Sequence, residues 1–274
     1  MITDVPRVSA AWLRLREPAD AGARARELVE PVHRHLAGAR RTVIHDLGTG
    51  IGSMGRWLAP QLPGAQHWIM YDRDPDLLER VCAEMVDASP HGEPVTMETR
   101  RCDITRLTAA DLDGASLVTA SALLDMLTAD EVERVVAACA GAGCPALLML
   151  SVTGRVELTP PDPLDVEIAE AFANHQRRTV GGRTLLGPDA VDATVAAFTR
   201  RGVAVRVRSS PWRLGAEHGD LASEWLTGWL AAACEQRPEL AGPAAGYARR
   251  RLAEAAAGRL GVMVQHQDLL AGCA

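Results

Sequence analysis

Residues 43–55 read VIHDLGTGIGSMG, a short apolar run that leads into four closely spaced glycines. Counted from Gly50, the stretch matches G-x-G-x-x-G, the glycine pattern of dinucleotide-binding turns. Counted from Asp46, it matches D-x-G-x-G-x-G, with a carboxylate at the end of the apolar run. Both patterns predict a strand, a tight turn and a helix in that order, so the stretch indicates an α/β fold and leaves two kinds of ligand open.

The rest of the chain alternates apolar strands with amphipathic helices. We expect strands at residues 42–47, 66–71, 95–101, 116–121 and 146–152, followed after a longer interval by 203–207 and 260–265. Helices are expected at 19–38, 52–62, from 75, from 129, and at 188–201, 217–236 and 243–258. Strands that alternate with helices in this way predict a doubly wound, mostly parallel sheet.

The length of 274 residues and a hydrophobic content of 47% predict one large domain over residues 1–274. Residues 1–40 are expected to form a helical segment that closes over the site as a lid. Residues 153–186 interrupt the alternation of strands and helices and are too long for a plain connection. We expect this segment and residues 209–258 to be helical insertions that shape a substrate pocket, because loops on a rigid scaffold carry specificity.

Composition and charge exclude several classes of function. All 29 basic residues are arginines, which is typical of a GC-rich genome, and we expect a bacterial protein of small-molecule metabolism. The net charge of -6 opposes a broad nucleic-acid surface. The chain has no apolar stretch long enough to span a membrane and no signal peptide, so a cytoplasmic protein is expected. The six cysteines lack metal-ligand spacing, and no metal is expected.

Three acids at strand ends bear on the choice of ligand. Asp46 lies two residues before Gly48, where a dinucleotide-binding strand is usually apolar, and its carboxylate suits a cationic group such as an amino group. Asp72 ends the second strand, where an acid accepts hydrogen bonds from ribose hydroxyls. Asp103 follows the third strand and could accept from an adenine amine. The ribose contact suits either ligand, whereas Asp46 and Asp103 favour one that is not a dinucleotide.

On these motifs, residues 42–152 resemble the class I S-adenosylmethionine (SAM)-dependent methyltransferases, and residues 187–274 fit more loosely. The resemblance implies a seven-stranded sheet with an antiparallel last strand, SAM as the cofactor and S-adenosylhomocysteine (SAH) as its product. It also implies that the glycine turn passes the amino-acid part of SAM. The implied cofactor-binding residues are Asp46, Gly48, Thr49, Gly50, Gly52, Asp72, Arg73, Asp103, Ile104 and Ser121.

Candidate catalytic residues are Asp125 and His175. Residues 119–125 read TASALLD, which differs from the N/D-P-P-Y/F motif of enzymes that methylate amide or base nitrogens. Asp125 follows strand four, where the methyl group would be delivered, and could equally cap the next helix. His175 could be a general base or an exposed helix histidine. His266 and Asp268 are expected in a turn after the last strand, and no catalytic role is expected for them.

Candidate substrate-binding residues are Trp12 and Arg16, which are expected before the first helix as part of the lid, and Trp212 and Trp225. The aromatic side chains could wall a pocket for a planar or cationic partner, or they could pack in the core. Trp225 shares a helix face with Trp229 and Leu221, which is typical of core packing.

We therefore expect SAM-dependent methyl transfer to an O, N or C nucleophile of a small molecule by in-line displacement, with a homodimer as the expected assembly. Two alternatives stay open. An NAD-dependent oxidoreductase would use residues 50–55 as a dinucleotide turn. A non-catalytic protein would keep the SAM fold as a scaffold or sensor.

Overall fold

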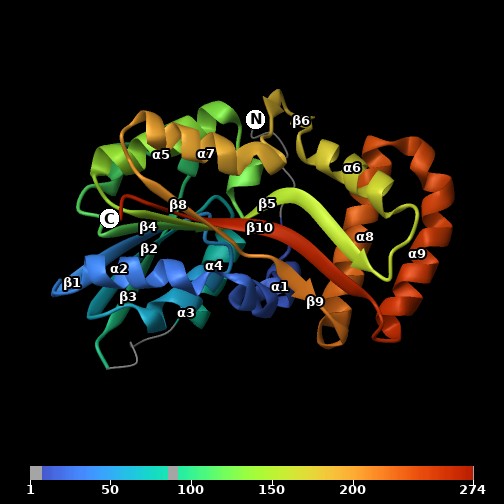
Figure 1. Cartoon of the computed structure of the whole chain (residues 1–274). Coiled ribbons are helices and arrows are strands. Elements are labelled where there is room, and N and C mark those ends of the chain that lie inside the picture. Colours follow the sequence, from blue (N-terminus) through green and yellow to red (C-terminus); the bar gives the residue numbers. More distant parts are fainter. Residues whose placement is uncertain (1–7, 86–91, 274) are drawn as a thin grey trace.

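The computed structural model describes residues 8–85 and 92–273 (Figure 1). Its helices are α1 (Ala10–Ala23), α2 (Val29–Leu36), α3 (Ser53–Leu58), α4 (Pro75–Glu84), α5 (Ala129–Ala142), α6 (Asp165–Gln176), α7 (Ala190–Arg200), α8 (Gly219–Gln236) and α9 (Ala241–Ala256). Its strands are β1 (Arg41–Leu47), β2 (Ala65–Asp72), β3 (Val95–Arg101), β4 (Leu117–Ser121), β5 (Ala146–Thr159), β6 (Thr179–Val180), β7 (Arg183–Thr184), β8 (Val205–Ser209), β9 (Trp212–Leu214) and β10 (Gly261–Ala271).

The main sheet has the strand order β3-β2-β1-β4-β5-β10-β8, and the short β9 adds an eighth strand beside β10. Strands β1 to β5 pair in parallel, whereas β10 is antiparallel to β5, β8 and β9. The predicted doubly wound sheet with an antiparallel last strand is therefore confirmed. The order reverses between β1 and β4, and ligands of open α/β sheets bind beyond the carboxyl ends of the strands at such a point.

Helices cover both faces of this sheet (Figure 1). One apolar cluster joins the sheet to α5 and α7, and a second joins the opposite face to α2, α3 and α4. The N-terminus of α5 carries the expected capping box, in which the Glu131 amide donates to Thr128 Oγ1 and the Thr128 amide donates to Glu131 Oε2. The first half of β5 is buried throughout, as a strand covered on both faces should be.

Two strands are longer than predicted. The strand expected at 146–152 continues to Thr159, and the strand expected at 260–265 continues to Ala271. β5 pairs with β4 only as far as Met149, so the rest of β5 extends past the carboxyl edge of the sheet together with β9 and β10. Helices α6, α8 and α9 pack against one face of this extension in a third apolar cluster. Antiparallel pairing supplies the backbone partners that the apolar pattern alone did not reveal.

The N-terminal segment also differs from expectation. The helix expected at 19–38 is instead the two helices α1 and α2, and α1 already begins at Ala10, where Ser9 caps it. The break follows from a distant contact, because the amide of Ala25 donates to Asp268 Oδ2 at 2.7 Å instead of to a helix carbonyl. Residues 1–7 of the expected lid segment lie outside the described residues.

His266 and Asp268 lie inside β10, so the turn expected for them is wrong. Asp268 is fully buried, where its carboxylate accepts from the amides of Ala25 and Leu150 and from the Ser210 hydroxyl. These partners let a charged side chain occupy the middle of a strand. In the described part of the chain, none of the helices combines the length and the apolar character needed to cross a bilayer.

Candidate functional site

The glycine turn follows β1 at the point where the strand order reverses. Gly48, Gly50 and Gly52 all have positive φ, at 65°, 57° and 84°. Only glycine adopts this region without strain, so the three residues are needed for the turn itself. The Thr49 amide donates to the Tyr71 carbonyl, and the Gly50 amide donates to Asp72 Oδ2, both at 2.9 Å. These bonds hold the turn against the end of β2.

Helix α1 lies over this turn. A Cβ at Gly50 would stand 3.1 Å from the Leu13 side chain. Glu17 of α1 pairs with Arg56 of α3 through two hydrogen bonds of 2.8 and 2.6 Å. Trp12 and Arg16 belong to α1 and not to a segment before the first helix, which corrects their expected position. The lid expected over residues 1–40 stays a prediction.

Asp46 is buried at the end of β1, and one of its two carboxylate oxygens has no hydrogen-bond partner among the described residues. Its Oδ1 accepts a hydrogen bond from Thr119 Oγ1 at 2.6 Å, whereas its Oδ2 is buried and has no partner among the described residues. Burial raises the pKa of Asp46 to about 6, against the lowering effect of the hydrogen bond from Thr119. A buried acceptor without a partner is costly unless a ligand supplies the donor.

Arg24 faces the same region, and it is not among the residues predicted from the sequence. Its side chain is buried between α1 and α2, and Nη2 donates to Ser121 Oγ at 3.2 Å and Ser53 Oγ at 3.4 Å. Its Nε and Nη1 are buried and have no partner among the described residues. Burial lowers the pKa of Arg24, and the negative charges of Asp20, Asp268 and Asp46 oppose this effect. The arginine stands in a short run of alternating Ala and Arg, GARAREL, whose local pattern gave no signal of burial.

Other predicted cofactor residues lie at the carboxyl ends of β2 and β3. The two oxygens of Asp72 accept from the amides of Asp74 and Gly50, and burial raises the pKa of Asp72. Asp103 is exposed, and its Oδ1 accepts from Thr105. Ile104 is buried in the cluster that contains Tyr71, and Arg73 is exposed beside Asp72. The fold thus gathers the predicted residues along one edge of the sheet.

A cavity of about 220 Å³ lies beside this edge and contains both predicted catalytic residues. Asp125 comes from the short 3-10 helix Leu124–Met126 after β4, and His175 comes from the last turn of α6. The remaining lining residues are Met126, Phe172, Gln176, Arg178 and Ala232. Leu123, two residues before Asp125, would lie 3.0 Å from a Cβ at Gly48, so the segment that carries Asp125 packs against the glycine turn.

Both ring nitrogens of His175 have partners. Nε2 lies 3.2 Å from Glu235 Oε2, and Nδ1 lies 3.3 Å from Arg178 Nη1. Burial lowers the pKa of His175, Arg178 lowers it further, and Glu235 opposes the shift. Because the guanidinium can only donate, Nδ1 accepts and Nε2 carries the proton toward Glu235. This arrangement occupies the lone pair that a general base would use.

The predicted aromatic residues separate into two groups. Trp12 lies near Trp212, with ring centroids 6.4 Å apart, and the Arg16 guanidinium stands 5.0 Å above the Trp212 ring. Trp212 is buried and donates from its indole nitrogen to Asp20 at 2.9 Å. Like Trp212, which belongs to the third apolar cluster, Trp225 lies in that cluster, and it stacks on Trp229 at 5.2 Å. Its surroundings favour core packing, the alternative left open for it.

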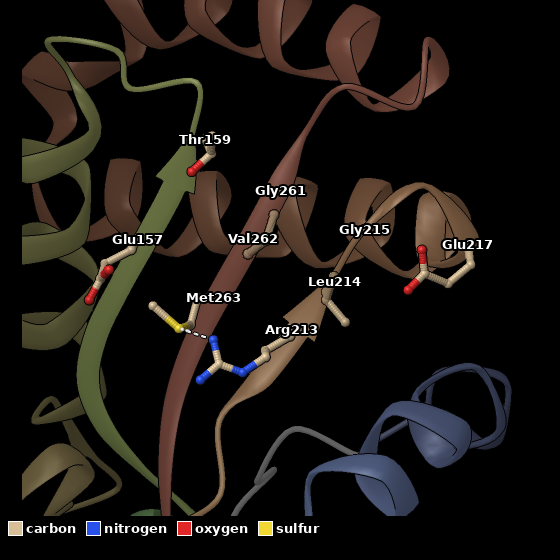
Figure 2. Close-up of a pocket in the computed structure, with 9 residues that line it drawn as sticks. All are labelled: Glu157, Thr159, Arg213, Leu214, Gly215, Glu217, Gly261, Val262 and Met263. Carbon is tan, nitrogen blue, oxygen red and sulfur yellow. Dashed lines mark hydrogen bonds between the residues drawn. The ribbon is translucent and has the colours of Figure 1, made fainter.

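A second hollow, of about 400 Å³, lies on the outer face of the extended strands (Figure 2). In Figure 2, Arg213 of β9 points across β10, with Nη1 3.0 Å from Met263 Sδ, and Glu157 of β5 lies farther across the same face. None of the predicted site residues lines this hollow. The glycine turn and the Asp125 cavity are therefore the candidate site.

Comparison with known proteins defines the fold. No protein-family model matches the chain, and no curated protein matches its sequence. The structure of the cyclopropane synthase MmaA2 from Mycobacterium tuberculosis is similar over 96% of this chain and 94% of that chain, with a TM-score of 0.52 and 14% identity.

Two further solved structures are more distant. A magnesium protoporphyrin IX methyltransferase from Synechocystis with bound SAH has a TM-score of 0.43 and 13% identity, covering 75% of this chain and 83% of that chain. A SAM-dependent methyltransferase from Geobacter sulfurreducens in complex with SAH has a TM-score of 0.42 and 15% identity, covering 98% and 99%. The strand order and the likeness to the cyclopropane synthase show that this chain has the class I SAM-dependent methyltransferase fold.

Proposed function

We propose that this protein binds SAM at the glycine turn and transfers its methyl group to a small-molecule acceptor. The observation that carries the proposal is the pair of unpartnered buried groups beside the turn. Asp46 Oδ2 is an acceptor without a donor, and Arg24 Nε and Nη1 are donors without an acceptor. A ligand with both an ammonium and a carboxylate group would complete both, and the methionine part of SAM carries these two groups.

The residues present fit SAM along its length. Asp46 would hold the amino group, and Arg24 with Ser53 and Ser121 would hold the carboxylate through charge-assisted hydrogen bonds. Asp72 would accept from the ribose hydroxyls, and residues 103–104 would border the adenine. When bound, SAM supplies an already activated methyl group. The chain itself would then need to align the acceptor, exclude water and receive a proton.

A dinucleotide fits the same groups less well. It would bring anionic phosphates to the glycine turn, next to the buried carboxylate of Asp46, where like charges repel. The oxidoreductase alternative also lacks a hydride-transfer residue set that the sequence analysis could identify. A non-catalytic SAM-binding protein would share every cofactor contact, and a turnover assay with candidate acceptors would distinguish it.

Calorimetric titration with SAH, and separately with NADH, tests the proposal. We expect micromolar binding of SAH and no binding of NADH. Binding of NADH alone would contradict the proposal and make residues 50–55 a dinucleotide turn. The cytoplasmic location and the homodimer stay predictions, which cell fractionation and light scattering would test.

A further inference from the structure

The cavity at the end of β4 contains a carboxylate that the cofactor would not use. Asp125 lines it, and among the described residues Asp125 has neither an ion-pair partner nor a hydrogen bond to another residue. The buried Oε1 of Gln176, on the same cavity, likewise has no partner in the described part of the chain. The carboxylate of Asp125 and the amide oxygen of Gln176 both accept hydrogen bonds. A ligand that completes them must bring hydrogen-bond donors.

The charges around Asp125 limit which hydrogen-bond donor the ligand can place there. Burial raises the pKa of Asp125, and in the described part of the chain the positive charges of Arg16 and Arg178 act against this shift. Arg16 is held by Asp20, and Arg178 by His175. An ammonium placed on Asp125 would have these two guanidinium groups as neighbours and would be repelled by both. A neutral hydroxyl group meets no such repulsion.

The size and walls of the cavity limit the rest of the ligand. Its volume is about 220 Å³, and Phe172, Met126 and Ala232 supply its apolar lining. A dry cavity of about 150 Å³ is large enough to bind benzene. One aromatic ring with a few small substituents therefore fills this space, and its face can pack on Phe172.

We propose that this cavity is the acceptor site and that it takes a monocyclic phenol, with the hydroxyl on Asp125 and the ring against Phe172. The assignment rests on the proposed methyl transfer and names its acceptor class. In the reaction the phenolic O–H bond breaks and its proton passes to Asp125. The oxygen uses the freed electron pair to bond the methyl carbon, and the carbon–sulfur bond breaks with its pair left on sulfur. The products are an aryl methyl ether, SAH and one proton.

Asp125 and not His175 is the proton acceptor in this assignment. The Nδ1 lone pair of His175 already accepts from Arg178, whereas the carboxylate of Asp125 has no such competitor among the described residues. His175 instead joins α6 to α8 through its Nε2 contact with Glu235.

Binding of three probes to the SAH-loaded protein tests the site, namely phenol, anisole and benzylamine. We expect phenol to bind with a Kd of about 1 mM or below, and at least tenfold more tightly than either other compound, because anisole has no donor and benzylamine is a cation. Asp125→Ala should remove the preference of phenol over anisole, whereas Phe172→Ala should weaken both equally. Asp130→Ala, on an exposed residue of the next helix, should leave the preference unchanged.

A second variant separates binding from proton transfer. Asp125→Asn keeps an acceptor oxygen but is no base, so phenol binding should stay within threefold while formation of anisole from phenol and SAM falls at least a hundredfold. Tighter binding of benzylamine than of phenol, absence of phenol binding at 10 mM, or an unchanged preference in Asp125→Ala would overturn the assignment. SAH binding without a phenol preference would overturn only the acceptor site. A phenol preference in the free protein without SAH binding would overturn only the proposed cofactor.

Discussion

Arg24 donates a hydrogen bond from Nη2 to Ser121 Oγ over 3.2 Å, which joins the residue after α1 to the last residue of β4. The two residues are 97 positions apart in the chain. The bond leaves Nε and Nη1 of Arg24 buried and without partners among the described residues. The guanidinium is thereby oriented before any ligand arrives, which reduces the entropy lost on binding.

Replacing Arg24 should weaken the binding of SAH and leave the binding of a shorter ligand nearly unchanged. Arg24→Met keeps the apolar stem and removes the donors, and hydrogen bonds to charged groups contribute about 2 kcal/mol, or roughly thirtyfold in Kd. The ligand 5′-methylthioadenosine lacks the amino and carboxylate groups, so its Kd should change less than threefold. Calorimetry measures both. Arg26→Met, on an exposed neighbour, is the matched control. Equal weakening of the two ligands would mean that Arg24 only supports the fold.

Asp46 should make the stability of the free protein depend on pH. Its folded pKa of about 6 exceeds the value of about 4 in an unfolded chain, so its contribution to stability is fully present below pH 4 and is lost as the pH rises through 6. Relative to the wild type, Asp46→Asn should therefore gain about 3 kcal/mol in the free energy of unfolding between pH 4 and pH 7.5. Urea denaturation at the two pH values measures the difference.

The comparison with Asp46→Asn is needed because other groups titrate in the opposite sense. Burial lowers the pKa of His45 to about 4 and that of His266 to about 3, so each contributes stability above about pH 6.5 that falls as the pH is lowered. Both histidines are present in both proteins, and their effects cancel in the difference. A difference that does not change with pH would show that Asp46 has the same pKa in the folded and the unfolded chain.

Binding of SAH should depend on the same carboxyl group. An ammonium ion on Asp46 favours the carboxylate, so the affinity of the wild type for SAH should fall about tenfold for each pH unit below 6. Asp46→Asn should bind more weakly at pH 7.5, and its Kd should be flat between pH 5 and 6. Titrations in buffers of different ionisation enthalpy count the protons released.

Gly50 should not tolerate a side chain. Its φ of 57° is strained for other residues, and a Cβ would meet Leu13 at 3.1 Å. Gly50→Ala should cost about 1–2 kcal/mol of stability and weaken SAH binding, because the turn and α1 must both shift. Gly22→Ala in α1 is the control, since nothing lies within 4 Å of a Cβ there and alanine favours the helix. Thermal unfolding and calorimetry should separate the two variants.

The Glu17–Arg56 pair should control release of the cofactor. Glu17→Gln removes the charge and one of the two acceptor oxygens from a partly buried contact between α1 and α3, so α1 should open more often and SAH should dissociate several-fold faster in stopped-flow experiments. Stability should change by less than about 1 kcal/mol, since partly exposed pairs contribute little. Glu30→Gln, from the exposed pair with Arg34, should leave the dissociation rate unchanged. An unchanged rate in Glu17→Gln would show that α1 is not a lid.

Much of the fold could be predicted because its signals are local. The strands at 42–47 and 95–101, the capping box at Thr128 and the glycine turn each rest on residues close together in the chain, and each is confirmed. The wrong predictions concern elements whose ends depend on contacts with distant segments of the chain. The N-terminal helix breaks because the amide of Ala25 donates to Asp268, 243 residues away. β10 continues through His266 and Asp268 because β5 and β8 supply partners for its backbone.

The candidate site also has parts that local sequence signals predict and parts that depend on distant contacts. The sequence by itself determined the order of strands and helices and the turn that only glycines allow, since backbone sterics and apolar periodicity act over a few residues. Only the tertiary structure decided that Arg24 is buried next to Asp46 and that Asp125 and His175 line one cavity. The free energy of a buried charge depends on which groups surround it in space. Here Arg24 and Asp46 are 22 positions apart in the chain and Asp125 and His175 are 50 apart, so no local pattern specifies either pair.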